Sequence, residues 1–453
     1  MKKKLLVGLL AASAVAGVAT GCSESKHYLN IHCWNDEFQG RFRAYSTEYE
    51  KTLSNGTDLL KDGTIVRWVI TPNDNNAYQN ALDAALEGQD SAKANDKVDV
   101  FLAEADYIIK YSKSSKSLDV KADIGLTDED LKDNYAYTQD IASYDGKLKG
   151  VTWQATPGLF AYRRDIATEV LGSDDPATVQ AALADWDKFD AVAASMKAKN
   201  YFMLSGYDDA YRTFSNNMSK PWVDSKGEVT IDANIKRWVD QTKDYTDKGY
   251  NNKTSLWSEQ WGKDQGPDGK VFGFFYSTWG INFTLLGNSL ADADGEKKVG
   301  NGLYGKYGVV EGPQSYYWGG TWIMAAKGTD DKDHIKQLMK DFASDKTITD
   351  AITRETEDYT NNKTAMHTIA TDSSYGSAFL GGQNHVALFE ESAKKISMKN
   401  MTAYDQGCNE KFQNAMKNYF DGTMTYEEAL AEFETNLKEV YPALSFNFEE
   451  AAK

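Results

Sequence analysis

Alternating apolar and polar residues near the start of the chain predict a β-strand. Leu29, Ile31 and Cys33 are separated by polar side chains, and this two-residue period is typical of a strand with one buried face. Two later runs, 64–70 and 98–102, are rich in Val, Ile and aromatic residues, which favour strands as well. We therefore expect three strands in this part of the chain.

Helical spacing lies between the predicted strands. In two segments, aromatic and leucine side chains recur every three or four residues, which is the spacing of one buried helical face. These residues are Phe42, Tyr45 and Tyr49 in the first segment, and Tyr78, Leu82 and Leu86 in the second. Gly88 predicts the end of the second helix, because glycine is a common residue at helix C-termini. Strands that alternate with helices predict an α/β fold with a mostly parallel sheet.

The segments that directly follow the strands carry the candidate chemistry. In a parallel α/β sheet, the ligand site lies at the carboxyl ends of the strands. The three segments are 34–38, 72–76 and 104–107, and each contains acids or amides, while two contain aromatic rings. We expect these side chains to line one site.

The second half of the chain predicts more helices and two more strands. Residues 185–265 are mostly helical in pattern, and apolar strands with glycines follow at 271–276 and 320–326. A capping box from Thr425 to Glu428 predicts the start of a C-terminal helix. The buried stripe of that helix is expected at Ala429, Phe433 and Leu437.

The domain organisation follows from the absence of a repeat or low-complexity linker between the halves. We expect two lobes joined by several strands, because independent domains are usually separated by a flexible linker. Residues 1–21 are predicted to be a signal peptide, and residues 22–27 a linker behind a lipid anchor.

The signal peptide is predicted from the charge pattern of the first residues. Three lysines follow Met1 and residues 5–19 contain no charged side chain, as in secretory signals. The apolar run is too short to span a membrane. Residues 19–22, Ala-Thr-Gly-Cys, resemble the bacterial lipobox, although Ala19 stands where that motif usually has Leu. The resemblance implies that Cys22 is acylated and holds the protein on the outer face of the cytoplasmic membrane.

Charge and cysteine content exclude several classes of protein. Removal of residues 1–21 changes the formal charge from −17 to −20, because it removes three lysines and no acid. Such an acidic chain is not expected to bind nucleic acid, whose binding proteins carry basic faces. Only Cys33 and Cys408 then remain. We expect them to be buried thiols in a protein held together by its core rather than by disulfides.

Motifs for metal binding, cofactor binding and catalysis are missing. The five histidines lack paired metal-ligand spacing, and Gly319-Gly320 fits no phosphate-binding loop. We expect no cofactor, no metal site and no enzymatic activity. Two pairs of neighbouring acids, at 36–37 and at 104 and 106, leave a glycoside hydrolase open as the least favoured alternative.

The polar and aromatic residues suit carbohydrate binding better. A sugar ring has an apolar face and a rim of hydroxyls, so its receptor needs flat aromatic rings together with carboxylates and amides. The candidate binding residues are Trp34, Asn35, Asp36, Glu37, Glu104, Asp106, Trp153, Gln154, Trp279, Trp318, Trp322, Gln383 and Asn384. Trp68, Trp186 and Trp238 are expected to pack in the core instead.

Several stretches of the chain resemble the carbohydrate-binding lipoproteins of ABC importers, the extracellular solute-binding proteins of family one. These stretches are 29–38, 101–107, 153–158, 317–322, 379–384 and the turn 404–406. The resemblance covers nearly the whole chain. It implies two lobes around a cleft, with hinges near 153–163, 320–326 and residue 372, which close on the ligand. By this resemblance, residues 28–153 and 323–372 are expected to form the first lobe, and residues 154–322 and 373–453 the second lobe.

The resemblance also implies roles for the candidate residues. Glu37, Glu104 and Asp106 would line the cleft from the first lobe. Trp279, Trp318, Gln383 and Asn384 would approach from the second lobe or the hinge, with Tyr207, Asp208 and Asp405 as further candidates.

The function predicted from the sequence is therefore a lipid-anchored receptor, expected to be a monomer, that delivers an oligosaccharide to the permease subunits of an ABC transporter. Its only contact with the membrane itself would be the lipid. A receptor for a cationic or peptide solute is the main alternative, because acids and aromatic rings also form cages for ammonium groups.

Overall fold

The structure, a computed structural model, describes residues 26–448 of the chain. The predicted alternation near the start forms β1 (Tyr28–Cys33). This strand pairs in parallel with β4 (Ile65–Ile70) on one side and with β5 (Val100–Glu104) on the other. The three predicted strands and their parallel arrangement are thus confirmed.

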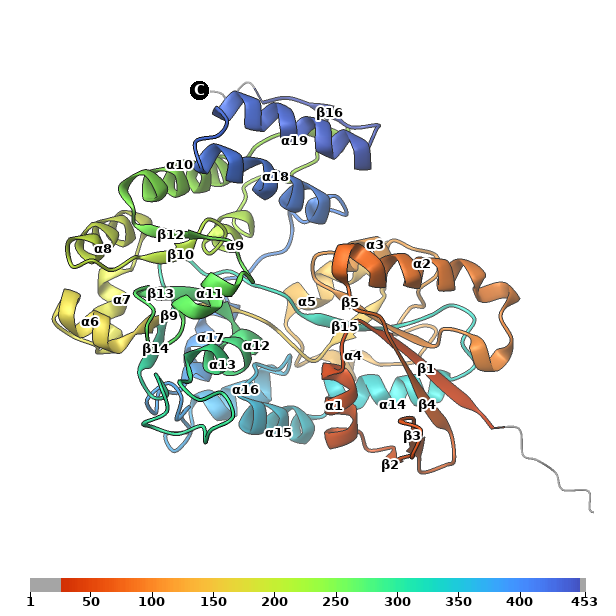
Figure 1. Cartoon of the computed structure of the whole chain (residues 1–453). Helices are drawn as coiled ribbons and strands as arrows, with labels where there is room; N and C mark the ends of the chain where they lie inside the picture. The colour runs from red at the N-terminus through yellow and green to blue at the C-terminus, as the bar shows by residue number, and fades with distance from the viewer. Residues whose placement is uncertain (1–25, 449–453) are drawn as a thin grey trace, which may run out of the picture.

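Seven strands form the sheet of the first lobe, in the order β2-β3-β4-β1-β5-β15-β8. β2 (Tyr49–Thr52) and β3 (Asp58–Leu60) extend one edge in antiparallel pairing. At the other edge, β15 (Thr321–Ala325) runs antiparallel to both β5 and β8 (Gly150–Thr152). The strand predicted at 320–326 is therefore confirmed, and it returns to the first lobe from the second half of the chain (Figure 1).

The helices of the first lobe are α1 (Glu37–Tyr45), α2 (Ala77–Gly88), α3 (Ile108–Ser112), α4 (Asp128–Leu131), α5 (Ala136–Ile141) and α14 (Lys332–Ala343). Short 3-10 turns lie at Asp74–Asn76, Gln89–Ser91 and Ala94–Asp96, and β6 (Ser143–Tyr144) pairs with β7 (Lys147–Leu148).

One local prediction in this lobe was wrong. Tyr49 lies in β2 and not on a helix, because α1 ends where Ser46 takes an extended conformation (ψ 130°). The predicted end of α2 at Gly88 is confirmed, although Gly88 has a right-handed φ of −75° and the chain continues into a 3-10 turn.

The second lobe differs from the predicted parallel sheet. Its central strand, β9 (Gly158–Arg163), is buried along its whole length and pairs antiparallel with β13 (Gly273–Ser277) and β14 (Tyr307–Val310). The prediction of a mostly parallel sheet was wrong here, because β9 enters directly from the hinge and runs opposite to both neighbours. β10 (Leu204–Gly206) and β12 (Asn251–Thr254) form a parallel pair, as do β11 (Glu228–Val229) and β16 (Ser445–Phe446).

Helices make up most of the remaining second lobe (Figure 1). They are α6 (Arg164–Leu171), α7 (Pro176–Ala182), α8 (Trp186–Ala198), α9 (Tyr211–Ser215), α10 (Ala233–Lys248), α11 (Glu259–Asp264), α12 (Thr278–Gly280), the π-helix η4 (Ile281–Leu285), α13 (Leu286–Ser289), α15 (Lys346–Thr356), α16 (Lys363–Ala370), α17 (His385–Ala393), α18 (Asp405–Phe420) and α19 (Tyr426–Val440). The capping box of Thr425 and Glu428 opens α19 as predicted, and Ala429, Phe433 and Leu437 are buried.

The connection between the sheets lies where β8 ends and β9 begins, at residues 153–157. A second segment runs beside it, since Gln154 forms a β-bridge with Thr360 and the Asn361 N–H donates to the Trp153 carbonyl (2.7 Å). α16 then packs against α17, which contacts β9 of the second lobe. The predicted boundary at residue 372 falls between these two helices, whereas α15 and α16 already lie beside the second lobe (Figure 1).

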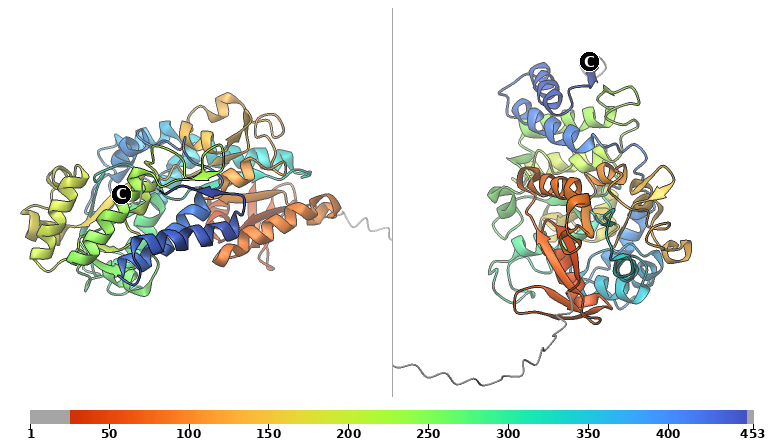
Figure 2. Two further views of the ribbon diagram at one scale, coloured as in Figure 1. Left: turned by 90° about the horizontal axis from the view of Figure 1, so that it is seen from above. Right: turned by 90° about the vertical axis from the view of Figure 1, so that its right-hand side faces the viewer.

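The start of α18 reaches the first lobe, where Gln406 Nε2 donates to Asn76 Oδ1 (3.2 Å). Figure 2 shows this approach of the C-terminal helices, in blue, to the first lobe. Cys33 and Cys408 are free and buried, as predicted. Within residues 26–448, no helix has the length and apolar character needed to cross a membrane. Cys22 and the predicted signal peptide lie outside the described residues.

Candidate functional site

A cavity of about 570 Å³ lies between the two lobes. On the first-lobe side it is lined by the three segments that follow β1, β4 and β5, as the parallel sheet predicts. On the other side it is lined by one face of α18. The lining residues are Trp34, Asn73, Asn75, Asn76, Glu104, Asp106 and Tyr107 from the first lobe, and Gln406, Glu410, Lys411 and Asn414 from α18.

Trp34 is held in the cavity wall by two tyrosines. Its ring meets Tyr78 edge-on at a centroid distance of 5.5 Å and Tyr107 at 6.2 Å. Trp34 itself is half-buried. The two edge contacts fix the orientation of the indole and leave it as an aromatic wall of the cavity.

Two residues that line this cavity each carry a buried side-chain oxygen that has no hydrogen-bond partner among the described residues. The two oxygens are the hydroxyl of Tyr107, a residue that is 5% exposed, and the side-chain oxygen of Asn73. A buried polar atom without a partner costs free energy, so such atoms are rare in native proteins.

Glu104 is the last residue of β5 and Asp106 follows it, and the two carboxylates form different hydrogen bonds. The Asp106 N–H donates to Glu104 Oε2 (2.7 Å). Burial and the negative charge of Asp106 raise the pKa of Glu104, while Arg212 opposes the shift. Asp106 accepts two hydrogen bonds from Arg212 of α9, at 2.5 and 2.6 Å, so its charge is paired across the two lobes.

A smaller cavity of about 190 Å³ lies behind this ion pair and includes Asp405 in its wall. Asp405 Oδ1 accepts from the backbone N–H of Thr402 (3.1 Å) and from its hydroxyl (2.6 Å). Burial raises the pKa of Asp405 to about 7.

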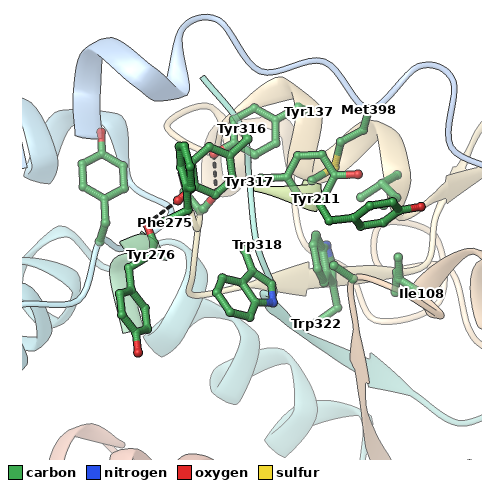
Figure 3. Packing of buried hydrophobic residues seen from close by; sticks show 14 of the residues in the cluster. Ile108, Tyr137, Tyr211, Phe275, Tyr276, Tyr316, Tyr317, Trp318, Trp322 and Met398 are labelled. Atoms are coloured by element: carbon green, nitrogen blue, oxygen red, sulfur yellow. Dashed lines mark hydrogen bonds between the residues drawn. The ribbon is translucent and has the colours of Figure 1, made fainter. Parts of the chain in front are cut away.

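Aromatic side chains from the second lobe gather beside Glu104. Trp279 Nε1 donates to the Trp318 carbonyl (2.9 Å), and the Trp318 ring stacks on Tyr276 at 6.2 Å. Figure 3 shows Trp318 near Tyr276 and Tyr317, with the Tyr316 hydroxyl bonded to the Tyr276 carbonyl.

Gly319 is the point where these rings approach the first lobe. Its φ is +77°, and a Cβ at this position would lie 2.9 Å from Trp279 Nε1 and 3.7 Å from Glu104 Oε1. A side chain here would therefore separate the acid from the aromatic cluster.

The predicted residue Glu37 belongs to a charged network at the hinge. Asp358, buried, accepts from Arg41 (3.2 Å), from Gln154 (3.0 Å) and from Thr278 (2.5 Å). Gln154 and Arg41 also donate to Glu37, at 3.2 and 3.3 Å. This network joins α1, the hinge and α12, so Glu37 and Gln154 are engaged with the protein itself.

Several predicted binding residues have structural roles instead. Trp153 and Trp322 are 0% and 1% exposed, and Trp153 stacks on Phe38. Gln383 exchanges two hydrogen bonds with the backbone of Val309. Asn384 caps α17 by accepting from Ala387 N. None of these four lines the interlobe cavity.

The remaining predicted residues lie around the cavities or outside them. Asn35 and Asp36 are exposed in the turn before α1. The buried Tyr207 donates to Asp421, and Asp208 Oδ2 accepts from the Leu256 N–H at 3.5 Å. Burial and the charge of Asp209 raise the pKa of Asp208 to about 6.

One group of acids among the described residues has the spacing of a cation site. Oxygens of Asp99, Asp330 and Asp331 lie within 4.8 Å of one another, at the opposite end of β5 from the cavity. His27 contacts Asp331 at 2.5 Å and the N-terminus of α14 lies next to it. The N-terminus of a helix favours negative charge, whereas burial raises the pKa of Asp99 and of Asp331.

Residues that the sequence did not single out complete the site. Arg212, Tyr107 and the α18 residues Gln406, Glu410 and Lys411 line the two cavities. Tyr107 stands inside a predicted segment, whereas α18 reaches the cavity only through the packing of the two lobes. Trp257, exposed beside Trp279, was also missed.

Comparison with known proteins gives a family for this architecture. The family model of the bacterial extracellular solute-binding proteins matches residues 60–383. No curated protein matches the chain. Among solved structures, an extracellular solute-binding protein of family 1 has a TM-score of 0.68 at 17% identity, covering 91% of this chain and 100% of its own.

Two structures of sugar complexes have similar folds. One is an ABC-transporter-associated binding protein from B. animalis subsp. lactis with β-1,6-galactobiose (TM-score 0.66, 16% identity, 93% of this chain and 100% of its own). The other is the galacto-N-biose/lacto-N-biose I-binding protein from Bifidobacterium longum with lacto-N-biose (0.65, 13%, 93% and 99%). At these identities the likeness shows a shared two-lobed fold.

Proposed function

Since the chain belongs to the bacterial extracellular solute-binding proteins, a family of receptors and not of enzymes, we propose that it captures an oligosaccharide between its lobes and delivers it to the permease of an ABC importer. The ligand would occupy the cavity between Trp34 and α18. The unpartnered Tyr107 hydroxyl and Asn73 oxygen in its wall are the observation that carries this proposal.

The chemistry of the cavity supports a sugar. Trp34 offers an aromatic wall, and the amides of Asn73, Asn75 and Asn76 offer donors and acceptors together. The raised pKa of Glu104 favours a protonated carboxyl group, which can donate as well as accept. The sugar-bound proteins from B. animalis and B. longum, which share the fold, point the same way.

The same cavity supports a cationic ligand less well. Arg212 pairs with Asp106, and Lys411 lines the opposite wall. A cage for an ammonium group needs unpaired acids or open aromatic faces, and only part of the acidic charge here is unpaired. Calorimetric titration with a cationic peptide tests this alternative, because its affinity would fall steeply with added salt.

The proposed ligand is tested by titrating the protein with a panel of mono- and oligosaccharides, using calorimetry and intrinsic tryptophan fluorescence. We expect saturable binding of at least one glycan with quenching or enhancement of the fluorescence. No response to any member of the panel would refute the proposal, and release of reducing ends from a glycan would indicate an enzyme.

Anchoring through Cys22 is part of the proposal. Strand β1 begins at Tyr28, so the linker after the lipid spans at most about 20 Å at full extension. It would hold the receptor close to the membrane and to the permease. Expression of Cys22→Ser in the native host should release the protein from the membrane fraction, and retention there would contradict the lipid anchor.

A further inference from the structure

Trp257 combines exposure with a strained backbone. Trp257 is 58% exposed, although tryptophan side chains usually bury most of their surface in a folded protein. Its φ is +67°, a left-handed conformation that is uncommon for a bulky residue. Strained backbone of this kind is found preferentially at binding sites, where the fold holds a side chain in place.

The rings around Trp257 connect it to the interlobe cavity. Trp257 lies nearly parallel to Trp279, with an interplanar angle of 22° and a centroid distance of 6.2 Å, and its centroid is 5.9 Å from that of Trp318. Trp279 Nε1 and Glu104 Oε1 both lie beside Gly319, since a Cβ on this glycine would be 2.9 Å from the first atom and 3.7 Å from the second. The rings of Trp279 and Trp257 therefore start near the cavity residue Glu104 and lead away from it.

A groove of about 490 Å³ begins on the other side of Trp257. Its lining combines the rings of Trp257 and Trp261 with the polar side chains of Ser258, Glu259, Lys263, Thr284 and Asn288. This mixture of flat rings and hydrogen-bonding groups is the chemistry that suits a sugar ring.

Phe283 is a second exposed aromatic residue, and it precedes a groove residue in the sequence. It is 80% exposed and lies in the π-helix η4, next to Thr284 of the groove lining. π-helical turns are rare and occur frequently at functional sites. η4 directly follows α12, which carries Trp279, so one continuous segment contributes to both the cavity side and the groove side.

We propose that this groove is a second carbohydrate subsite, in which a glycan leaving the interlobe cavity passes over Trp257 and continues toward Phe283. The inference rests on the proposed function, since a single glycan would occupy the interlobe cavity and the groove together. The occupant is the distal part of a linear oligosaccharide, because Trp257 lines the groove and packs on Trp279, whose Nε1 lies beside Gly319 close to the cavity residue Glu104. The receptor is thus built for glycans longer than those that the cavity encloses.

The test measures affinity as a function of chain length. Calorimetry would use α-1,4-glucan, β-1,4-glucan, β-1,4-xylan, β-1,4-mannan and β-1,6-galactan oligosaccharides, each from disaccharide to octasaccharide. Wild type is compared with Trp257→Ala and Phe283→Ala. Tyr144→Ala, which changes an exposed ring in the β6–β7 hairpin of the first lobe, is the matched control.

In the series that binds, affinity of the wild type should increase from short to long oligomers. Trp257→Ala should reduce that increase by about tenfold, the strength of one good aromatic stacking contact. Phe283→Ala should weaken only the longer oligomers, and Tyr144→Ala should change none. Trp257 is largely exposed and strained, so its loss should leave the thermal midpoint unchanged.

Two outcomes would overturn the inference and leave the proposed function intact. One is a wild-type affinity that does not change with length. The other is that Trp257→Ala and Phe283→Ala keep the wild-type ratio of long-chain to short-chain affinity. That result would indicate that the two exposed rings contact a protein partner and not the glycan. Failure of every series to bind wild type would overturn the proposed function and the groove together.

Discussion

The guanidinium of Arg212 donates to both carboxylate oxygens of Asp106, at 2.5 and 2.6 Å, and so joins α9 of the second lobe to the end of β5 in the first. Both side chains are about three-quarters buried. A bidentate, partly desolvated pair is stronger than a surface ion pair. The contact stabilises the arrangement in which the lobes face each other across the cavity.

Arg212→Ala should therefore shift the protein toward a more open form. Its loss removes the cross-lobe pair and leaves Asp106 unpaired, which costs about 1.5–3 kcal/mol. We expect a larger radius of gyration by small-angle scattering without ligand, and weaker glycan binding. Arg237→Ala, whose partner Asp187 is exposed, should change neither quantity, and an unchanged scattering profile in Arg212→Ala would contradict this role.

Tyr107→Phe separates ligand binding from stability. The Tyr107 hydroxyl has no partner among the described residues, so its removal should leave the free energy of unfolding unchanged or slightly increased. Glycan affinity should fall about fivefold, the value of about 1 kcal/mol for one hydrogen bond. Calorimetry and urea unfolding measure the two effects.

The control for this variant is Tyr316→Phe. The Tyr316 hydroxyl donates to the carbonyls of Leu159 and Tyr276, both at 2.9 Å, inside the second lobe. That variant should lose stability and keep its affinity, the reverse of Tyr107→Phe. Equal loss of stability in both variants would show that Tyr107 has a structural role.

Asp358→Ala tests the hinge network. Its carboxylate is 2% exposed and accepts from Arg41, Gln154 and Thr278. Removal of one partner of a buried ion pair costs about 3–5 kcal/mol, because the remaining charge loses its compensation. Asp350→Ala removes a partner of Arg354 that is 26% exposed, in contrast to the buried Asp358, and should cost less than about 1 kcal/mol. Similar denaturation midpoints for the two variants would contradict the network's importance.

Stability should fall as the pH rises above about 5. Burial raises the pKa of Asp405 to about 7 in the folded state, whereas an unfolded Asp titrates near about 3.9. Between these values the folded protein binds the proton that the unfolded chain has released, so a higher pH favours unfolding. The stabilising effect is complete below about pH 4 and is lost as the pH passes through about 7.

Asp405→Asn should reduce this pH dependence. Asparagine keeps the Oδ1 acceptor that Thr402 uses and carries no charge. Thermal melts at pH 5 and pH 8 should show a smaller loss of stability in the variant than in wild type. Asp294→Asn, in an exposed loop, is the control, and an unchanged pH slope in Asp405→Asn would show that Asp405 does not titrate in this range.

The sequence predicted the first-lobe side of the cavity because that side follows from the hydrophobic pattern of single strands and from their parallel pairing. Apolar alternation identified β1, β4 and β5, and the parallel arrangement placed Trp34 and Glu104 at one edge of the sheet. The segments that follow these strands, 34–38, 72–76 and 104–107, were predicted to line the site. Tyr107 lies in the last segment but was not named as a binding residue.

The second-lobe side could not be predicted in the same way. Trp153 and Trp318 are both next to polar or glycine-rich segments, yet Trp153 stacks against Phe38 in the core, while Trp318 joins the cluster with Trp279. Which ring is buried depends on the packing of distant segments. Arg212 lies in the short helix α9, which packs against α10, and Trp257 follows β12, so their positions depend on the packing of the second lobe, which the sequence pattern did not reveal.

The most direct test of the account is a crystal structure of the protein with the glycan that binds most tightly in the titrations. We predict electron density for a sugar ring between Trp34 and α18, with a hydroxyl within hydrogen-bond distance of the Tyr107 oxygen. A glycan bound outside this cavity, with the Tyr107 hydroxyl still without a partner, would contradict it.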